Sequence, residues 1–217
     1  MLISECLTKI YKRFEKSSDT PDPLTEDYVV RLEYVNASID KWENELGVEW
    51  KELYKTLTGS LVNGVFNNTS ALADFKKPAG KLYIGSDVYD YVRPERVAEE
   101  TSLRPTRKIY TVTGSKGTYA IRVYPAVSAD FVLDYKKRAT KYTTGVESTP
   151  EIEMSDPEFI IHDVLGQLYL DDDNGSQANV STQIATAKMD AMKLANEVPP
   201  FNNNNDTPED GFSGFGN

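Results

Sequence analysis

The apolar residues change their periodicity twice along this chain, and this change constrains the fold more than any other feature. Residues 25–46 carry an apolar residue at intervals of 4-3-4-3-4, which predicts a helix of about 22 residues with a narrow packing seam. The seam consists of Tyr28, Leu32, Val35, Ile39, Trp42 and Leu46. Residues 2–14 and 50–61 also have helical spacing, so the chain is expected to begin with three helices.

The middle of the chain has the pattern of β-strands instead. Residues 109–113 and 118–124 are rich in β-branched and aromatic side chains, and the glycine-containing segment 114–117 joins them. This arrangement predicts a β-hairpin. Further short strands are expected at residues 81–84 and 131–135.

Helical spacing returns after Pro150 and continues almost to residue 197. Asp156 as the N-cap, with Pro157 at the first helical position, predicts a helix over residues 157–170. A last helix, rich in alanine and methionine, is predicted over residues 180–196. The residues after it have low complexity and predict a disordered tail.

These patterns together predict an α+β fold. We expect a helical bundle core of about five helices, with an inserted antiparallel β-hairpin or small sheet and a disordered C-terminal tail. The expected parts are an N-terminal helical part at 1–77, a β-rich insertion at 78–135, a C-terminal helical part of the same core at 136–196, and a flexible tail at 197–217.

The net charge of −10 is unevenly distributed. Residues 151–217 contain 13 Asp and Glu against two lysines, whereas residues 76–141 contain 14 Lys and Arg against seven acidic residues. The overall acidity argues against a dedicated DNA-binding protein, but the basic middle can face a polyanion. Alternatively, both regions are solvated surfaces.

Cysteine use and hydropathy predict a protein made in the cytoplasm and not associated with a membrane. The single cysteine, Cys6, has no partner for an internal disulfide, which suits a reducing compartment. No apolar stretch approaches the roughly 20 residues that span a bilayer. The first residues do not have the pattern of a secretory signal.

No set of residues predicts catalysis, a metal site or a cofactor. The one histidine, His162, has no catalytic signature around it, and one His with one Cys excludes an ordinary four-ligand zinc site within a single chain. The acidic run 171–175 does not form a calcium loop, because Leu170 and Ser181 would occupy its anchoring positions. The turn 114–117 lacks the spacing of a phosphate-binding loop. We therefore expect no enzyme activity and no cofactor.

The best functional candidates are residues suited to contact. A basic cluster beside the strand at 131–135, with a lysine in the hairpin turn, can touch DNA phosphates without reading sequence. These DNA-channel candidates are Lys116, Lys136, Lys137, Arg138 and Lys141. The alternatives are a solvated strand end or partners for acidic helices of a neighbouring copy. The phenylalanines of the Gly/Ser-rich tail suit a docking peptide, or are simple tail composition.

Four segments of the chain resemble the head–tail connector proteins (adaptor or neck proteins) of tailed bacteriophages. They are YVVRLEYVNASIDKWENEL at 28–46, FVLDYKKRA at 131–139, SDPEFIIHDVLGQLYLDDD at 155–173 and ATAKMDAMKLAN at 185–196. Such proteins often have an aromatic-x-aliphatic-x-Tyr strand, a helix that starts at Pro-Glu, and a last helix with a Met/Ala-rich stripe. The resemblance covers residues 25–196 and rests mainly on residues 131–195.

The resemblance implies a structural virion protein that joins the portal of the phage head to the tail or neck and lines the DNA channel. It implies a ring, usually of twelve copies, that is made in the host cytoplasm and contacts the portal protein, a downstream tail or neck protein and, without specificity, genomic DNA. A mostly negative lumen would let DNA slide without sticking. The C-terminal helix or tail of such proteins typically contacts the portal. The residues implied here are Met189, Met192, Leu194, Phe201, Phe212 and Phe215.

Two other functions stay open from the sequence. A helical scaffold or accessory assembly protein would share the packing seam and the tail, but it has no obvious need for the hairpin insertion. A small cytosolic enzyme would need a constellation of polar residues in a cleft.

Overall fold

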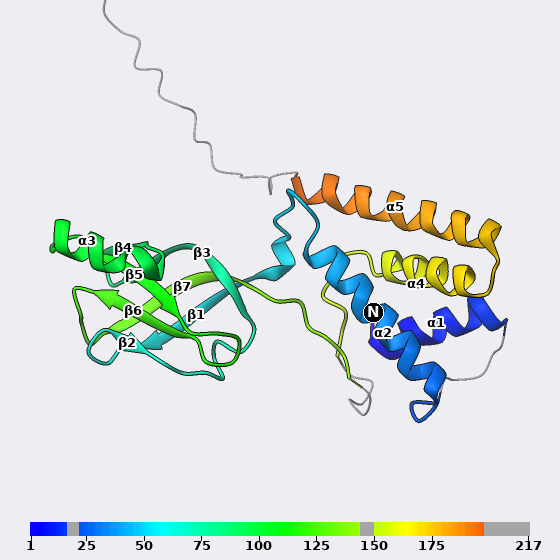
Figure 1. Ribbon diagram of the computed structural model, residues 1–217, viewed down its shortest axis with the longest axis horizontal. Coiled ribbons are helices and arrows are strands. Elements are labelled where there is room, and N and C mark those ends of the chain that lie inside the picture. The colour runs from blue at the N-terminus through cyan, green and yellow to red at the C-terminus, as the bar shows by residue number, and fades with distance from the viewer. Residues whose placement is uncertain (17–21, 144–149, 198–217) are drawn as a thin grey trace, which may run out of the picture.

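The computed structural model describes residues 1–16, 22–143 and 150–197, which form a helical lobe and a β lobe that lie side by side (Figure 1). The helical lobe contains α1 (Ile3–Glu15), α2 (Glu26–Glu43), α4 (Glu158–Asp171) and α5 (Gly175–Glu197). The β lobe contains β1 (Tyr54–Ser60), β2 (Val65–Phe66), β3 (Phe75–Ile84), β4 (Asp87–Tyr91), α3 (Val97–Leu103), β5 (Ile109–Thr113), β6 (Ala120–Tyr124) and β7 (Asp130–Lys137). Short 3₁₀ turns lie at Lys51–Leu53 and Pro94–Arg96.

The helical lobe is built around α4. This helix contacts α1, α2 and α5, so it is apolar on nearly every side, and Ile160, Ile161 and Val164 are all fully buried. The expected helix over 157–170 is confirmed as α4. Asp156 accepts a hydrogen bond from the backbone N–H of Glu158 at 3.1 Å, which satisfies one of the free donors at the start of the helix.

The predicted seam of α2 faces this core over most of its length. Thr25 caps the helix by accepting from the N–H of Tyr28 at 3.3 Å. Leu32, Val35, Ile39 and Trp42 are buried, and Tyr28 is half-buried against the same core. Leu46 is 91% exposed, because α2 ends at Glu43 and the chain turns away before Leu46 reaches the core.

The β lobe corrects the expected fold class. The fold is α+β, but the expected hairpin or small antiparallel sheet is wrong. The sheet is large, mixed and curled into a half-barrel, with seven strands in the order β1-β7-β3-β4-β5-β6-β2. Among the described strands only β4 and β5 pair in parallel, and the predicted hairpin is present as β5 and β6. The β-rich part therefore begins at residue 54 and continues to residue 137.

The expected third helix over residues 50–61 is also wrong. Tyr54–Ser60 forms β1, whose seven residues pair in register with β7, from Tyr54 opposite Lys136 to Ser60 opposite Asp130. The leucines of this segment fit helical spacing, but the β7 partner fixes the strand, because strand preference depends on the neighbouring strands. The missed local signal is Asn63-Gly64, which has positive φ at both residues and turns the chain from β1 into β2.

Glycine 59 allows the sheet to curl. Phe66 of β2 packs edge-on against Phe131 of β7, with ring centroids 5.0 Å apart, although β2 and β1 are the opposite edges of the sheet. A Cβ at Gly59 would lie 2.7 Å from the Phe66 ring. The edge strands therefore approach each other only because β1 has no side chain at this point.

We predict that the turn at Gly64 is required for the curled sheet. Gly64→Ala should destabilise the protein by about 3 kcal/mol, because the φ of +76° is unfavourable for alanine and the new Cβ would lie 2.9 Å from Ala126. Gly85→Ala is the matched control, with φ +57° and open space around its Cβ, and should cost about 1 kcal/mol. Urea unfolding measures the free energy of unfolding of both variants. An equal decrease in the two variants would contradict a special role of the Gly64 turn in the sheet.

Candidate functional site

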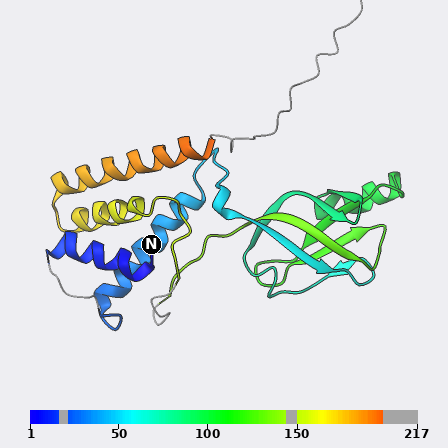
Figure 2. The same ribbon diagram turned by 180° about the vertical axis from the view of Figure 1, so that it is seen from behind.

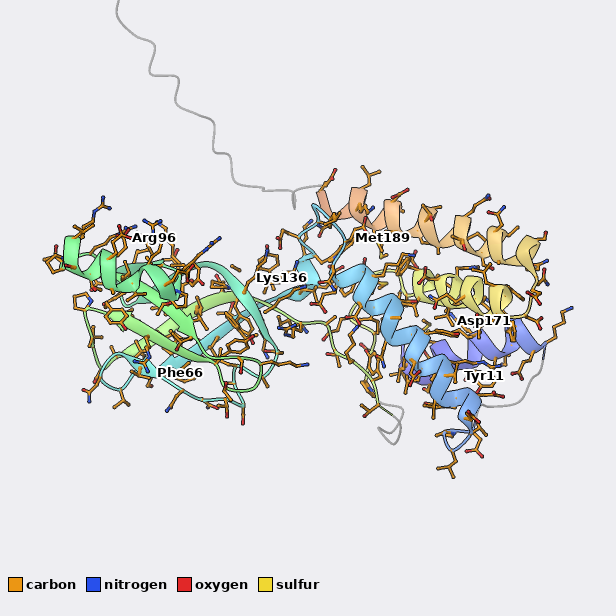
Figure 3. The ribbon with its side chains drawn as sticks, viewed as in Figure 1. Tyr11, Phe66, Arg96, Lys136, Asp171 and Met189 are labelled. Carbon is orange, nitrogen blue, oxygen red and sulfur yellow. The ribbon has the colours of Figure 1, made fainter. Side chains whose placement is uncertain are left out.

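The predicted basic cluster lies where the two lobes meet, with Lys136 between them (Figure 3). Lys136 is 4% exposed, and its Nζ lies 3.1 Å from the carboxylate of Glu49. Lys137 Nζ lies 2.5 Å from Glu153. These cations therefore neutralise carboxylates of the same chain, and a buried ammonium needs such a partner.

A third ion pair links α2 to β3 across the same junction. The Glu43 carboxylate, at the end of α2, is buried and lies 2.6 Å from Lys76 Nζ of β3. Its other oxygen accepts from the backbone N–H of Ala139 at 3.0 Å. Glu43 thus contacts both β3 and the segment that follows β7.

Glu49 forms ion pairs with two lysines at the junction, Lys77 and Lys136. The hydrogen bond from Lys77 is the largest cause that lowers the pKa of this carboxyl below its ordinary value. Burial acts in the opposite direction, and Lys136 adds to the lowering. Glu49 therefore stays ionised while it is paired, and it accepts from one exposed and one buried lysine.

The end of α5 is fixed to the same junction. Asn196 donates to the carbonyl of Glu49 at 2.9 Å and accepts from the N–H of Lys51 at 3.2 Å. Lys193 lies 2.5 Å from Glu45. Sequence reasoning missed Glu43 and Glu49 as partners, because Glu49 and Lys136 are 87 positions apart and carry no local signal of pairing.

The five DNA-channel candidates therefore have different surroundings. Lys141 lies 2.7 Å from Asp40, so it is paired like Lys136 and Lys137. Arg138 is half-buried, and its Nε has no hydrogen-bond partner among the described residues. Lys116 is exposed in the turn between β5 and β6, and no ion pair joins it to another described residue. Contact with DNA stays a prediction for all five.

The portal-docking candidates also separate into groups. Met189 and Met192 are each 4% exposed and belong to the core of the helical lobe, so a partner can reach them only if α5 moves. Leu194 is 67% exposed. Phe201, Phe212 and Phe215 lie outside the described residues. Portal contact stays a prediction for the whole set.

The outer face of α5 carries a second apolar stripe that the sequence reading did not separate from the first. Figure 2 shows α5 at the edge of the helical lobe, and α4 is the helix it packs against. The buried side of α5 includes Ala178, Ser181, Ala185, Met189 and Met192. The exposed stripe consists of Val180, Ile184, Ala187, Ala191 and Leu194, at intervals of 4-3-4-3. The 4-3-4-3 spacing in the sequence could have predicted a second apolar stripe on this helix. Only the tertiary structure shows that this stripe faces outward.

Cys6 and His162 are the cysteine and the histidine of the chain, and burial shifts the pKa of each side chain. Burial raises the pKa of the Cys6 thiol to about 12, so the thiolate that acts as a nucleophile is scarce. Burial, followed by the charge of Arg13, lowers the pKa of His162, whose Nε2 lies 3.2 Å from the Arg13 guanidinium. Within residues 1–16, 22–143 and 150–197, no three His, Cys, Asp or Glu side chains are placed to hold a metal ion.

We predict that the lobe junction weakens on acidification. The folded-state pKa of Glu49 is lowered, so its contribution is present above the ordinary value of 4.5 and is lost as the pH falls through the folded value. Glu49→Gln should lower the free energy of unfolding at pH 7 by about 2 kcal/mol, a modest cost because the Glu49 side chain is half exposed. Between pH 6 and pH 3, the free energy of unfolding of this variant should then fall less than that of the wild type.

Thermal unfolding across this pH range measures the difference. Glu33→Gln is the matched control, because Glu33 is exposed on α2 and makes no ion pair with a described residue. If Glu49→Gln and Glu33→Gln follow the same pH profile, Glu49 does not hold the lobes together.

The comparisons with known proteins do not identify a family. No protein-family model matches the chain, and no curated protein matches it. Among the described residues, no helix is both long enough and apolar enough to cross a membrane. The surfaces of the molecule are therefore the basis for a functional proposal.

Proposed function

We propose that this chain is a structural assembly protein of the head–tail connector type, which forms a ring between the portal of a phage head and the tail or neck. The exposed stripe of α5 is the observation that carries the proposal. Val180 is 49% exposed, Ile184 36% and Leu194 67%, on the side of α5 that faces away from α4. A helix with one apolar face in the core and another facing outward suits packing against a second protein surface.

The charge distribution on α5 supports a protein partner for this face. Charged residues make up 27% of the chain, yet residues 174–187 contain none. Interface cores are depleted of charge in the same way, because an unpaired charge is costly to bury. Ala187 and Ala191 also let another backbone approach closely.

The charges of the two lobes favour contacts between different surfaces of neighbouring copies. Residues 54–137 contain 13 Lys and Arg against 8 Asp and Glu. The segments 1–53 and 138–197 together contain 11 Lys and Arg against 23 Asp and Glu. Attraction between the basic lobe of one copy and the acidic lobe of the next gives a head-to-tail contact. Repeated head-to-tail contacts form a closed ring when the rotation between neighbouring copies is a whole fraction of a full turn.

The same charges bear on the DNA channel. An acidic helical lobe on the lumen side would repel phosphates and let DNA slide, whereas exposed cations such as Lys116 would touch it only locally. The neutralised lysines of the junction are unsuited to hold DNA strongly. Virion location and the absence of enzyme activity belong to this proposal.

We predict that the α5 stripe drives self-association. Ile184→Lys should weaken oligomer formation at least about tenfold, because a buried isoleucine contributes about 2 kcal/mol and a lysine adds a desolvation cost. Gln183→Lys is the matched control: it adds the same charge one position along the helix and off the stripe. Sedimentation velocity over a range of concentrations, with negative-stain microscopy for rings, compares the three proteins, and equal association would remove the stripe from the interface.

An affinity pull-down of the tagged chain from infected cells, with mass spectrometry, tests the connector role itself. We expect portal and tail or neck proteins to be recovered with the wild type and with Gln183→Lys, and less with Ile184→Lys. Recovery of a metabolic partner, or of no partner, would contradict the connector role and favour an enzyme or scaffold.

A further inference from the structure

Strand β1 leaves one edge of the sheet open. It pairs with β7 on one side, and no described strand pairs with it on the other, where the Phe66 ring of β2 lies close to Gly59 near the end of β1. In an antiparallel pair, alternate N–H and C=O groups of each strand point away from the partner. The free edge of β1 can therefore accept another extended segment.

Two grooves lie along β1 and hollow the outer face of the sheet. The groove at its start has a volume of about 330 Å³ and is lined by Tyr54, Lys55, Thr56, Ala79 and Asp134. The groove at its end has a volume of about 520 Å³, and its lining includes Thr58, Gly59, Ser60, Tyr83, Phe131 and Val132. Each groove is bordered by three consecutive residues of β1, so a segment beside this strand lies next to both.

The larger groove has an apolar wall that no described residue covers. Val132 lies opposite Thr58 on one side and Tyr83 on the other, so the three side chains form a row across β1, β7 and β3. Val132 is 41% exposed and Tyr83 43%. An aromatic side chain seated there would remove this apolar surface from water.

The end of α5 points to the segment that can occupy these grooves. Asn196 binds the backbone of Glu49 and Lys51, only three residues before β1 begins. The described chain therefore ends close to Glu49, which is hydrogen-bonded to Tyr54 of the first groove. Twenty extended residues reach about 66 Å, and a strand of seven residues is about 23 Å long. The segment is long enough to follow the whole of β1.

The chemistry of residues 198–217 matches this surface. The segment contains three phenylalanines, Phe201, Phe212 and Phe215, for the grooves. These side chains are complementary in polarity to the apolar wall formed by Val132 and Tyr83, which are 41% and 43% exposed.

We propose that residues 198–217 dock on the free edge of β1 in the same copy of the chain. The backbone of the segment pairs with the outward groups of β1, and phenylalanine rings fill the two grooves, with Phe201 the nearest to the groove at Tyr54. This docking does not depend on the connector role. It means that the tail phenylalanines are covered in the free protein and that a partner must displace them before it can bind them.

Hydrogen exchange of the full-length chain tests the proposal. The outward amides of residues 55–60 should exchange slowly in the wild type, because the docked segment accepts their hydrogen bonds. A triple variant with Phe201→Ser, Phe212→Ser and Phe215→Ser should exchange these amides at least about tenfold faster. Leu24→Ser is the matched control, because Leu24 is 93% exposed, lies in the helical lobe and should leave β1 unchanged.

The effect of protein concentration on the exchange rates of the β1 amides shows whether the segment docked on β1 comes from the same copy or from another copy. If the β1 amides stay protected from exchange over a fiftyfold dilution, docking within one copy is supported. If this protection from exchange disappears on dilution, the proposal is overturned in favour of a second copy at this edge. Equally fast exchange in the wild type and the triple variant would show that residues 198–217 do not cover β1.

Discussion

The pairing of β1 with β7 is the contact on which the two-lobed structure depends. The β lobe is inserted between α2 and α4, so the chain leaves the helical lobe at β1 and returns to it at β7 (Figures 1 and 2). Because Tyr54 lies opposite Lys136, the two crossings are adjacent. The helices that precede and follow the insertion can therefore share one core around α4, which no continuous stretch of sequence would supply.

In this arrangement the basic cluster has a structural role at the contact between the two lobes. Lys136 and Lys137 are the last two residues of β7, and their partners Glu49 and Glu153 lie in the segments that connect the lobes. A buried lysine is tolerated only with such a partner, so the cluster holds the orientation of the lobes more readily than it holds a polyanion. In the proposed connector, contact with DNA would then be made by exposed cations such as Lys116, and the net charge of a lobe would matter more than the local run of basic residues.

Two surfaces stand out because no described residue covers them once the lobes are assembled. The outer stripe of α5 is uncharged and apolar, and the edge of β1 combines free backbone groups with two grooves. They differ in the partner they suit, because α5 offers side chains for helix packing whereas β1 offers backbone hydrogen bonds for an extended segment. The proposed ring uses the first surface, and the proposed tail docking uses the second.

The sequence by itself determined the elements whose signals are local. The Thr25 cap, the start of α4 beside Asp156, the seam from Leu32 to Trp42 and the hairpin of β5 and β6 were predictable, because each depends on residues within one or two turns or strands. It did not determine that residues 54–60 form a strand, or that Lys136 meets Glu49, because pairing partners some 80 positions away decide both. The direction of each α5 stripe was likewise decided only by tertiary structure, because two apolar faces of one helix are equivalent until α4 covers one of them.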